Sequence, residues 1–231
     1  MIGIDSLGKE IYANKLSKDK LYGDNMAKIP IPVALRLPLY HEYVSRMEAQ
    51  GCRWISSNMI AGYLDLTPST IRQDIKYLGR IDSSSFGYNA ENFRLVLEKT
   101  LGISSGANLA LVGIGSVGSA LIHYKGFREK NFSIKALFDK REELIDTQIE
   151  GITVFPVGRM AEVIKRERIT IGVIATPADS AQAVADLLVA ANIKGIWNFA
   201  PINLRVPPQV IIENVNLLPS LFTLAFKIKN T

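Results

Sequence analysis

The chain has 231 residues, of which 48% are hydrophobic and 21% charged, and this length and composition suit one large or two modest folded domains. Its formal net charge of +5 permits a nucleic acid partner without requiring one. No apolar run approaches the roughly 20 residues of a membrane span, and the first 26 residues lack the apolar core of a signal peptide. Cys52 is the only cysteine, so we expect no disulfide within the chain and a cytoplasmic protein. The two histidines, His41 and His123, have no partner at ligand spacing, so we expect no metal site. We also expect no membrane contact.

The first predicted helix follows an irregular start. Residues 1–26 show no sustained hydrophobic period, and we interpret them as an N-terminal extension. A helix is predicted from Pro30 to about Gln50, where apolar residues recur at helical spacing. Pro38 is expected to distort this helix or to mark a later start. The predicted buried face consists of Val33, Leu37, Tyr40, Val44 and Met47.

Two short helices are predicted next. The first is capped by Ser56 or Ser57 and ends near Leu64. The second covers residues 67–79, with signals for its start in Thr67-Pro68 and for its end in Gly79. Because only two residues separate the helices, the pair predicts a helix-turn-helix.

The second of these helices has two contrasting faces. Ile71, Ile75 and Leu78 form a predicted buried stripe. The polar side chains expected to point outward, toward a DNA groove, are Ser69, Thr70, Arg72, Gln73 and Lys76.

A wing and a further helix complete the predicted N-terminal domain, residues 27–103. The polar segment 80–89 has the length of a wing between two strands. Residues 91–101 form a predicted helix that Gly102 ends. The run Ser104-Ser105-Gly106 is the expected domain boundary.

Beyond the boundary, apolar strands alternate with helices, which predicts an α/β domain with a doubly wound parallel sheet over residues 107–212. The predicted strands are 109–112, 134–138, 153–155, 170–175 and 195–198, and the predicted helices are 160–167 and 180–191. A final helix is expected near 219–228, within a C-terminal segment 213–231. Its Leu221, Leu224, Phe226 and Ile228 are too apolar for an exposed tail, so we expect it to cross to a second copy in a homodimer.

The glycine-rich turn after the first of these strands predicts a dinucleotide site. The motif Gly113-Ile114-Gly115-Ser116-Val117-Gly118 follows an apolar strand and opens a helix, and Asp139 ends the next strand. The glycines permit the tight turn, the approach of the backbone to a pyrophosphate and close packing of the helix on the sheet. Asp139 is expected to accept hydrogen bonds from the adenosine ribose and to favour NAD over NADP, although Lys140 and Arg141 weaken that preference.

Other expected cofactor contacts lie at the ends of later strands. Thr176-Pro177 follows one strand and Asn198-Phe199-Ala200 ends the next, at the sheet edge where nicotinamide usually lies. Lys140 and Tyr124 complete the expected cofactor-binding set. Each of these short phrases is also compatible with an ordinary turn between a strand and a helix.

An NAD site also raises the alternative of an oxidoreductase. Hydride transfer to a carbonyl needs a proton donor and an anchor for the substrate. No Tyr-x-x-x-Lys pair, His-Asp pair or arginine clamp stands out, and His123 lies within the helix that the glycine turn opens. The sequence therefore favours a protein that binds NAD(H) without catalysis.

These motifs together resemble the Rex family of redox-sensing repressors from about residue 29 to residue 229. The matching phrases, in order, are RLPLY at 36–40, ISS at 55–57, IRQDIKYLG at 71–79, GY at 87–88, VGIGSVGSAL at 112–121, FD at 138–139, TP at 176–177, ADLLVAA at 185–191, IKGIWNFAP at 193–201 and IENV at 212–215. The resemblance implies a homodimer that exchanges its C-terminal helices and binds palindromic operator DNA. It also implies that NADH releases the repressor from DNA. Arg72 and Gln73 would then reach base edges, and Ser57, Ser69, Thr70 and Lys76 would hold phosphates.

Three departures from the family pattern leave a second reading open. The stretch 82–88 has an acid and no base, where the family wing carries Lys or Arg before a glycine. Gln73 stands where a lysine is usual, and Asn216-Leu217 where Asp-Phe is usual. Fewer cations weaken contacts with phosphates. The alternative is therefore an NAD(H)-binding paralogue with lost or altered DNA recognition.

Overall fold

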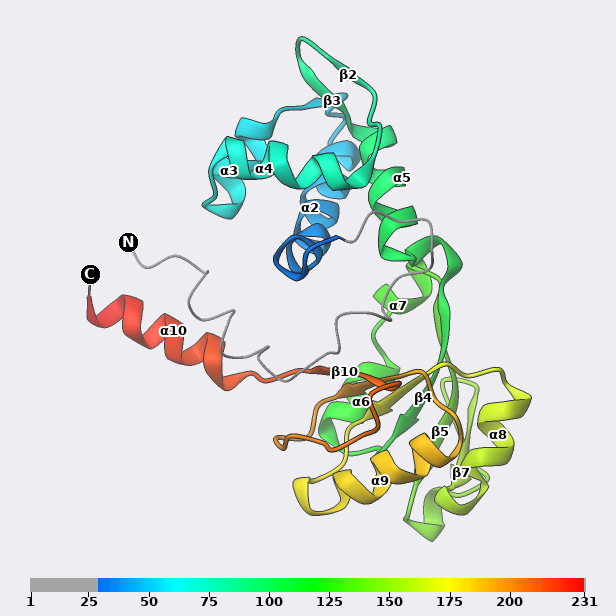
Figure 1. The fold of residues 1–231 in the computed structure, drawn as a ribbon. Helices are drawn as coiled ribbons and strands as arrows, with labels where there is room; N and C mark the ends of the chain where they lie inside the picture. Colours follow the sequence, from blue (N-terminus) through cyan, green and yellow to red (C-terminus); the bar gives the residue numbers. More distant parts are fainter. Residues whose placement is uncertain (1–28, 231) are drawn as a thin grey trace. The chain divides into compact units, whose positions relative to one another are not determined.

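The computed structural model describes residues 29–230, which divide into two units between Ser104 and Ser105 (Figure 1). The N-terminal extension predicted for residues 1–26 lies outside the described residues. Each unit has its own hydrophobic core and is described separately.

The first unit packs helices around a small three-stranded sheet. Its helices are α2 (Ile31–Ala49), α3 (Ser57–Leu64), α4 (Pro68–Ile75) and α5 (Ala90–Leu101), and a 3-10 turn, Lys76–Leu78, follows α4. Strands β1 (Trp54–Ile55), β2 (Ser83–Ser84) and β3 (Gly87–Asn89) pair antiparallel in the order β1-β3-β2. The predicted wing is therefore confirmed, but its two strands lie inside the segment 80–89 rather than on either side of it.

Helix α2 runs without interruption through Pro38, so a late start at that residue is wrong. Proline leaves one carbonyl of the preceding turn without its helical partner. Val33 and Leu37 before it, and Tyr40 and Val44 after it, are all buried, so both halves of the helix pack into the same hydrophobic core.

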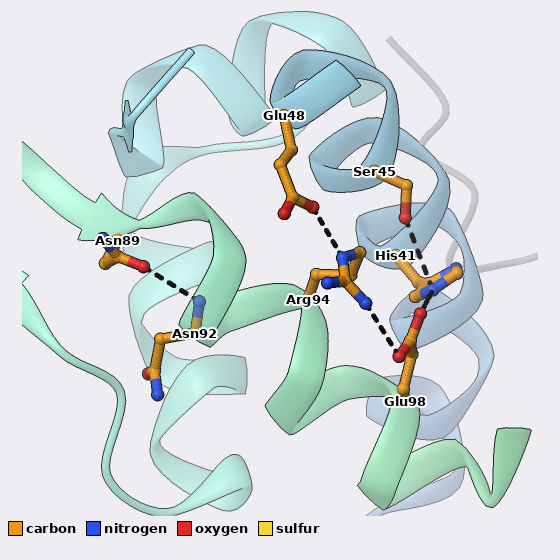
Figure 2. Close-up of polar contacts among 7 residues, drawn as sticks. All are labelled: His41, Ser45, Glu48, Asn89, Asn92, Arg94 and Glu98. Atoms are coloured by element: carbon orange, nitrogen blue, oxygen red, sulfur yellow. Dashed lines mark hydrogen bonds and ion pairs between the residues drawn. The ribbon is translucent and has the colours of Figure 1, made fainter. Parts of the chain in front are cut away.

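A polar cluster joins α2 to α5 across their contact (Figure 2). Arg94 donates from Nε to Glu48 at 2.6 Å and from Nη1 to Glu98 at 2.9 Å. His41 Nε2 lies 3.2 Å from the other oxygen of Glu98 and 3.4 Å from the Ser45 hydroxyl. Burial alone would raise the pKa of Glu98, but its hydrogen bonds with His41 and Arg94 outweigh that effect and lower the pKa. The cluster thus keeps a partly buried carboxylate ionised between the two helices.

An ion pair between partly buried Arg36 and buried Asp74 connects α2 to the second helix of the helix-turn-helix. Arg36 donates to both oxygens of Asp74, at 2.7 Å from Nε and 2.8 Å from Nη2, and the Tyr40 hydroxyl also donates to Asp74. Burial, together with the bond to Asp74, raises the pKa of Tyr40, so its hydroxyl stays protonated. Asp74 is one turn from Ile71 on the same face, which explains how an acidic residue joins the buried stripe.

We expect Asp74→Ala to destabilise the first unit by about 3 kcal/mol, the low end for a buried pair, because it leaves the partly buried Arg36 charge without its partner. Chemical denaturation followed by circular dichroism measures the change. The exposed Asp82 on the wing provides the control variant Asp82→Ala, which should stay within about 0.5 kcal/mol of the unmodified protein. A loss for Asp74→Ala no larger than that of the control would contradict the role of this ion pair.

The second unit contains a seven-stranded sheet with the order β10-β9-β8-β4-β5-β7-β6. All neighbouring strands are parallel except the edge pair β6 and β7. The strands are β4 (Ala107–Val112), β5 (Phe132–Asp139), β6 (Gln148–Ile149), β7 (Ile152–Pro156), β8 (Ile171–Ile174), β9 (Gly195–Asn198) and β10 (Ile211–Asn214). Apart from β6, this is the strand order of a doubly wound dinucleotide-binding fold.

Helices cover both faces of this sheet, as the continuous apolar strands predict. Ala110 and Val112 of β4 pack on one face, in a cluster with residues of α8 (Met160–Arg166) and α9 (Ala178–Ala190). Leu109 and Leu111 point to the other face, in a cluster with Ile122 of α6 (Ser116–Ile122). A short helix, α7 (Gly126–Glu129), precedes β5.

The sheet extends further along the chain than predicted. Strand β10 pairs with β9, with Ile211 opposite Gly195, so the domain end expected at residue 212 falls inside a strand. The short apolar run 210–212 is the sequence feature that could have predicted this strand.

Helix α10 (Leu218–Lys229) then projects from the end of the sheet (Figure 1), and none of its residues is buried.

Within residues 29–230, no helix combines the length and apolar character needed to cross a bilayer. The same part of the chain brings together no three His, Cys, Asp or Glu side chains as a potential metal site.

Candidate dinucleotide and DNA sites

The carboxyl ends of β4 and β8 meet where the strand order reverses. Gly113, directly after β4, has φ +95°, and a Cβ there would lie 2.8 Å from the carbonyl oxygen of Ala175 after β8. Only glycine allows this combination of backbone conformation and close approach. In open parallel sheets, ligands bind in the crevice at this reversal point.

The other two glycines of the motif have different roles. A Cβ at Gly118 would lie 2.0 Å from the Gly113 carbonyl oxygen, so Gly118 is needed for α6 to pack against the turn. A Cβ at Gly115 would meet no atom of the described residues within 4 Å, and Gly115 itself is exposed at the start of α6. Ser116 and Val117 are exposed beside it. The space over Gly115 is therefore open for a group that approaches the backbone closely.

Asp139 closes the neighbouring side of the crevice at the end of β5. Its buried carboxylate accepts from the Ile114 N–H at 2.8 Å and from the Arg141 side chain at 3.0 Å on each oxygen. Burial would raise the pKa of Asp139, but hydrogen bonds from Arg141 and Ile114 outweigh this and lower it to about 2. The carboxylate is therefore ionised and tied to the glycine turn.

The hydroxyl of Thr176 is buried and has no hydrogen-bond partner among the described residues. Thr176 lies beside the glycine turn, since its methyl carbon would be 2.8 Å from a Cβ at Gly113. Pro177 follows it, exposed, as the N-cap of α9. A buried hydroxyl without a partner costs free energy unless a bound group satisfies it. This orphaned hydroxyl and the open space over Gly115 fit a polar ligand such as a dinucleotide.

Asn198 does not present a free side chain to the crevice. It is fully buried, and its amide group donates to the carbonyls of Ala200 and Ile202 and to Asn214 of β10. Its Oδ1 accepts from the Ala200 N–H at 3.0 Å. Asn198 therefore shapes the loop after β9, which contains the half-buried Phe199 and buried Ala200, rather than offering an amide to a ligand.

Of the two remaining predicted residues, one lies at the crevice and the other does not. Lys140 is exposed next to Asp139. Tyr124 lies beyond the far end of α6, where its exposed ring packs edge-on against Phe127 with centroids 4.9 Å apart. The cavity that Tyr124 lines includes Phe132 and Ile152, at the amino ends of β5 and β7, which is the opposite edge of the sheet. Within this chain the structure does not bring Tyr124 to the glycine turn.

In the first unit, side-chain hydrogen bonds at the N-caps begin the two helices of the helix-turn-helix. Ser56 accepts from the Met59 N–H at 3.2 Å and begins α3, which excludes Ser57 as the cap. Thr67 accepts from the Thr70 N–H at 3.2 Å and begins α4, and Asp65 in the left-handed region ends α3. These local hydrogen bonds define the turn between the two helices.

The outward face of α4 presents the predicted polar residues. Arg72, Gln73, Lys76 and Ser69 are exposed, whereas Thr70 and Ser57 are half-buried. Arg72 donates from Nη1 to the Ser57 hydroxyl at 3.1 Å, and the Ser69 and Thr70 hydroxyls each lie 2.9 Å from Thr67 Oγ1. The structure thus brings Ser57 and Arg72 into direct contact across the turn.

The tip of the wing carries no positively charged side chain. Ser85 and Phe86 connect β2 and β3, and Phe86 is 74% exposed. Ser83 and Ser84 are exposed as well, and the stretch 82–88 contains no Lys or Arg.

Sequence reasoning missed two contacts at these sites. It did not anticipate that Arg141 binds Asp139, although the separation of two residues places opposite charges in one loop. It also did not place Asp74 in the core, although the helical spacing from Ile71 is a usable signal.

Comparisons with known proteins match both units. The model of the CoA binding domain family matches residues 105–202, and that of the putative DNA-binding protein N-terminus family matches residues 28–75. The redox-sensing transcriptional repressor Rex of Clostridioides difficile is 40% identical over 201 residues, which cover 87% of this chain and 96% of the relative.

Two similar solved structures are of RSP, which is described as a Rex-family repressor. The complex of RSP with β-NAD⁺ and operator DNA has a TM-score of 0.81 and 36% identity, covering 88% of this chain and 94% of that one. The complex with β-NADH has a TM-score of 0.82 and 36% identity, covering 88% and 96%. With this identity spread over both units, the chain belongs to the Rex family of redox-sensing transcriptional repressors.

Proposed function

We propose that this protein is a cytoplasmic repressor that binds palindromic operator DNA as a homodimer and is released when it binds NADH. The observation that supports this most directly is the match over both units to a relative solved with NAD⁺ and operator DNA and also with NADH. A sensor of this kind needs no catalytic group, only different binding free energies for NADH and NAD⁺ in two conformations.

In this proposal the crevice at the reversal point holds the dinucleotide. The turn of Gly113, Ile114 and Gly115 approaches the pyrophosphate, and Ser116, Val117 and Gly118 begin the helix behind it. Asp139 and Lys140 lie at the adenosine ribose. Thr176, with its orphaned hydroxyl, lies with Pro177, Phe199 and Ala200 on the other side of the crevice. Asn198 acts through the loop that it holds in place, and Tyr124 would need a second subunit or a rearrangement to take part.

The DNA contacts are assigned to the outward face of the helix-turn-helix. Arg72 and Gln73 read base edges in the major groove, and Ser57, Ser69, Thr70 and Lys76 hold phosphates. The bond from Arg72 to Ser57 orients the guanidinium before DNA binds.

Homodimer formation is assigned to α10. Its large apolar residues, including Leu221 and Phe222, are more than half exposed. Exposed apolar surface of this extent marks a protein interface. A second copy is the partner that the family membership suggests, through exchange of the two C-terminal helices.

The lack of cations on the wing supports a second candidate function. Exposed Ser83 and Ser84 offer no cation to the DNA backbone, which would suit a paralogue that binds NAD(H) but has lost or altered operator recognition. We expect operator binding to survive but to be weaker than that of a relative with a basic wing.

The test is fluorescence anisotropy with a palindromic Rex-type operator at two salt concentrations, with and without NADH. Specific binding that NADH reverses supports the repressor, whereas binding that ignores sequence and vanishes with modest salt supports the paralogue. Arg72→Ala should cost about 1–3 kcal/mol of specific binding if it reads a guanine. Lys99→Ala, which removes an exposed cation from α5, is the charge-matched control and should have little effect.

A further inference from the structure

The carboxylate at the end of β5 already has a cationic partner. Arg141 donates to Asp139 Oδ1 from its Nε at 3.0 Å and from its backbone N–H at 3.1 Å. Its Nη2 donates to Oδ2 at 3.0 Å, and the Ile114 N–H donates to the same oxygen at 2.8 Å. These bonds use the roughly four acceptor positions of a carboxylate. A ribose hydroxyl can therefore reach Asp139 only if Arg141 releases part of it.

The Arg141 guanidinium also contacts the glycine turn. Its Nη2 donates to the Ile114 carbonyl at 2.9 Å, so the group bridges the turn after β4 and the end of β5. That position is where the adenosine ribose lies in this fold. Asp139 is 7% exposed, whereas the Arg141 side chain is 45% exposed and open to an incoming group. Within the described part of the chain, no acceptor lies at Arg141 Nη1, which leaves two N–H donors available.

An acidic residue at this position normally excludes a 2′-phosphate by charge repulsion, whereas a nearby arginine accommodates it. Here both residue types are present and in contact. The guanidinium offsets the negative charge of Asp139 and offers the paired donors that bind phosphate oxygens well. The exposed Lys140 adds a second cation beside them.

We propose that Arg141 determines specificity at the adenosine ribose subsite, and that this subsite accepts 2′-phosphorylated dinucleotides of the NADP(H) class as well as NAD(H). The inference rests on the proposed function, because it places a dinucleotide in this crevice. The 2′-phosphate binds the Nη1 side of the guanidinium without displacing it from Asp139. The ribose of NAD(H), by contrast, competes with Arg141 for the carboxylate.

Isothermal titration calorimetry of the full chain with NADH and with NADPH tests this proposal. We expect unmodified protein to bind NADPH within about tenfold of its affinity for NADH. Arg141→Ala should raise the ratio of the NADPH to the NADH dissociation constant by about tenfold or more, because NADPH loses charge-assisted hydrogen bonds. Arg166→Ala, which removes an arginine of similar side-chain exposure, 46%, at the end of α8, should leave the ratio unchanged.

The possible outcomes distinguish the role of Arg141 from the proposed function. If NADH binds but NADPH does not saturate, or if Arg141→Ala leaves the ratio of dissociation constants unchanged, the role of Arg141 is overturned while the proposed function stands. If neither dinucleotide binds, the proposed function itself fails. A thermal melt of Arg141→Ala, expected to show a lower midpoint but one cooperative transition above the temperature of the titration, shows that a changed ratio does not arise from unfolding.

Discussion

Replacing Gly115 with valine is expected to abolish NADH binding and to leave the fold intact. The backbone at Gly115 is extended, with φ −80°, and a Cβ there would meet nothing within 4 Å in the described part of the chain, so the folded protein tolerates a side chain. The added methyl groups would fill the space through which the pyrophosphate approaches the turn. We expect the affinity for NADH to fall by at least about 100-fold, measured by calorimetry or by NADH fluorescence.

Gly118→Ala provides the contrast. A Cβ at Gly118 would lie 2.0 Å from the Gly113 carbonyl oxygen, so this variant should lose about 1–3 kcal/mol of stability through overpacking. Thermal unfolding should therefore separate the two substitutions, with a lower midpoint for Gly118→Ala alone. Micromolar binding of NADH by Gly115→Val would show that the ligand does not lie over this turn.

The paired substitution Leu221→Asp and Leu224→Asp is expected to convert the protein from dimer to monomer. The two residues lie three apart on α10, on one helical face, and both are more than half exposed. Burying two leucines at an interface stabilises the dimer by roughly 3–6 kcal/mol, and buried carboxylates would add a further penalty. The dimer dissociation constant should rise by more than about 100-fold.

Sedimentation velocity at micromolar concentration measures this effect. Leu95→Asp is the matched control, because it places the same charge on an exposed apolar position of α5 and should leave the dimer unchanged. A monomeric unmodified protein at that concentration would contradict the role of α10. The paired variant should also lose operator affinity, because a palindrome is bound by two subunits together.

Features that depend on neighbouring residues were predictable from the sequence. The cap at Thr67 and the end at Gly102 each rest on hydrogen bonds within three or four residues, and both lie where the pattern predicts. The strand, glycine turn and helix around residues 107–122 belong to the same class, since the turn needs the positive φ of Gly113 and the contact of Gly118 with the Gly113 carbonyl. Strand β10 escaped prediction because a four-residue edge strand is defined by its partner β9 rather than by its own pattern.

By itself, the sequence determined the two-domain order, the helix-turn-helix, the doubly wound sheet and the position of the glycine turn, because these follow from hydrophobic period and local backbone chemistry. Only the tertiary structure decided which polar side chains are free to meet a ligand. Asp74 is bound by Arg36, 38 residues away, and Asn198 by Asn214, 16 residues away, whereas the Thr176 hydroxyl has no partner within residues 29–230. A buried polar group takes its partner from whichever element the fold places beside it, and that neighbour is not encoded in the residues next to it in the chain.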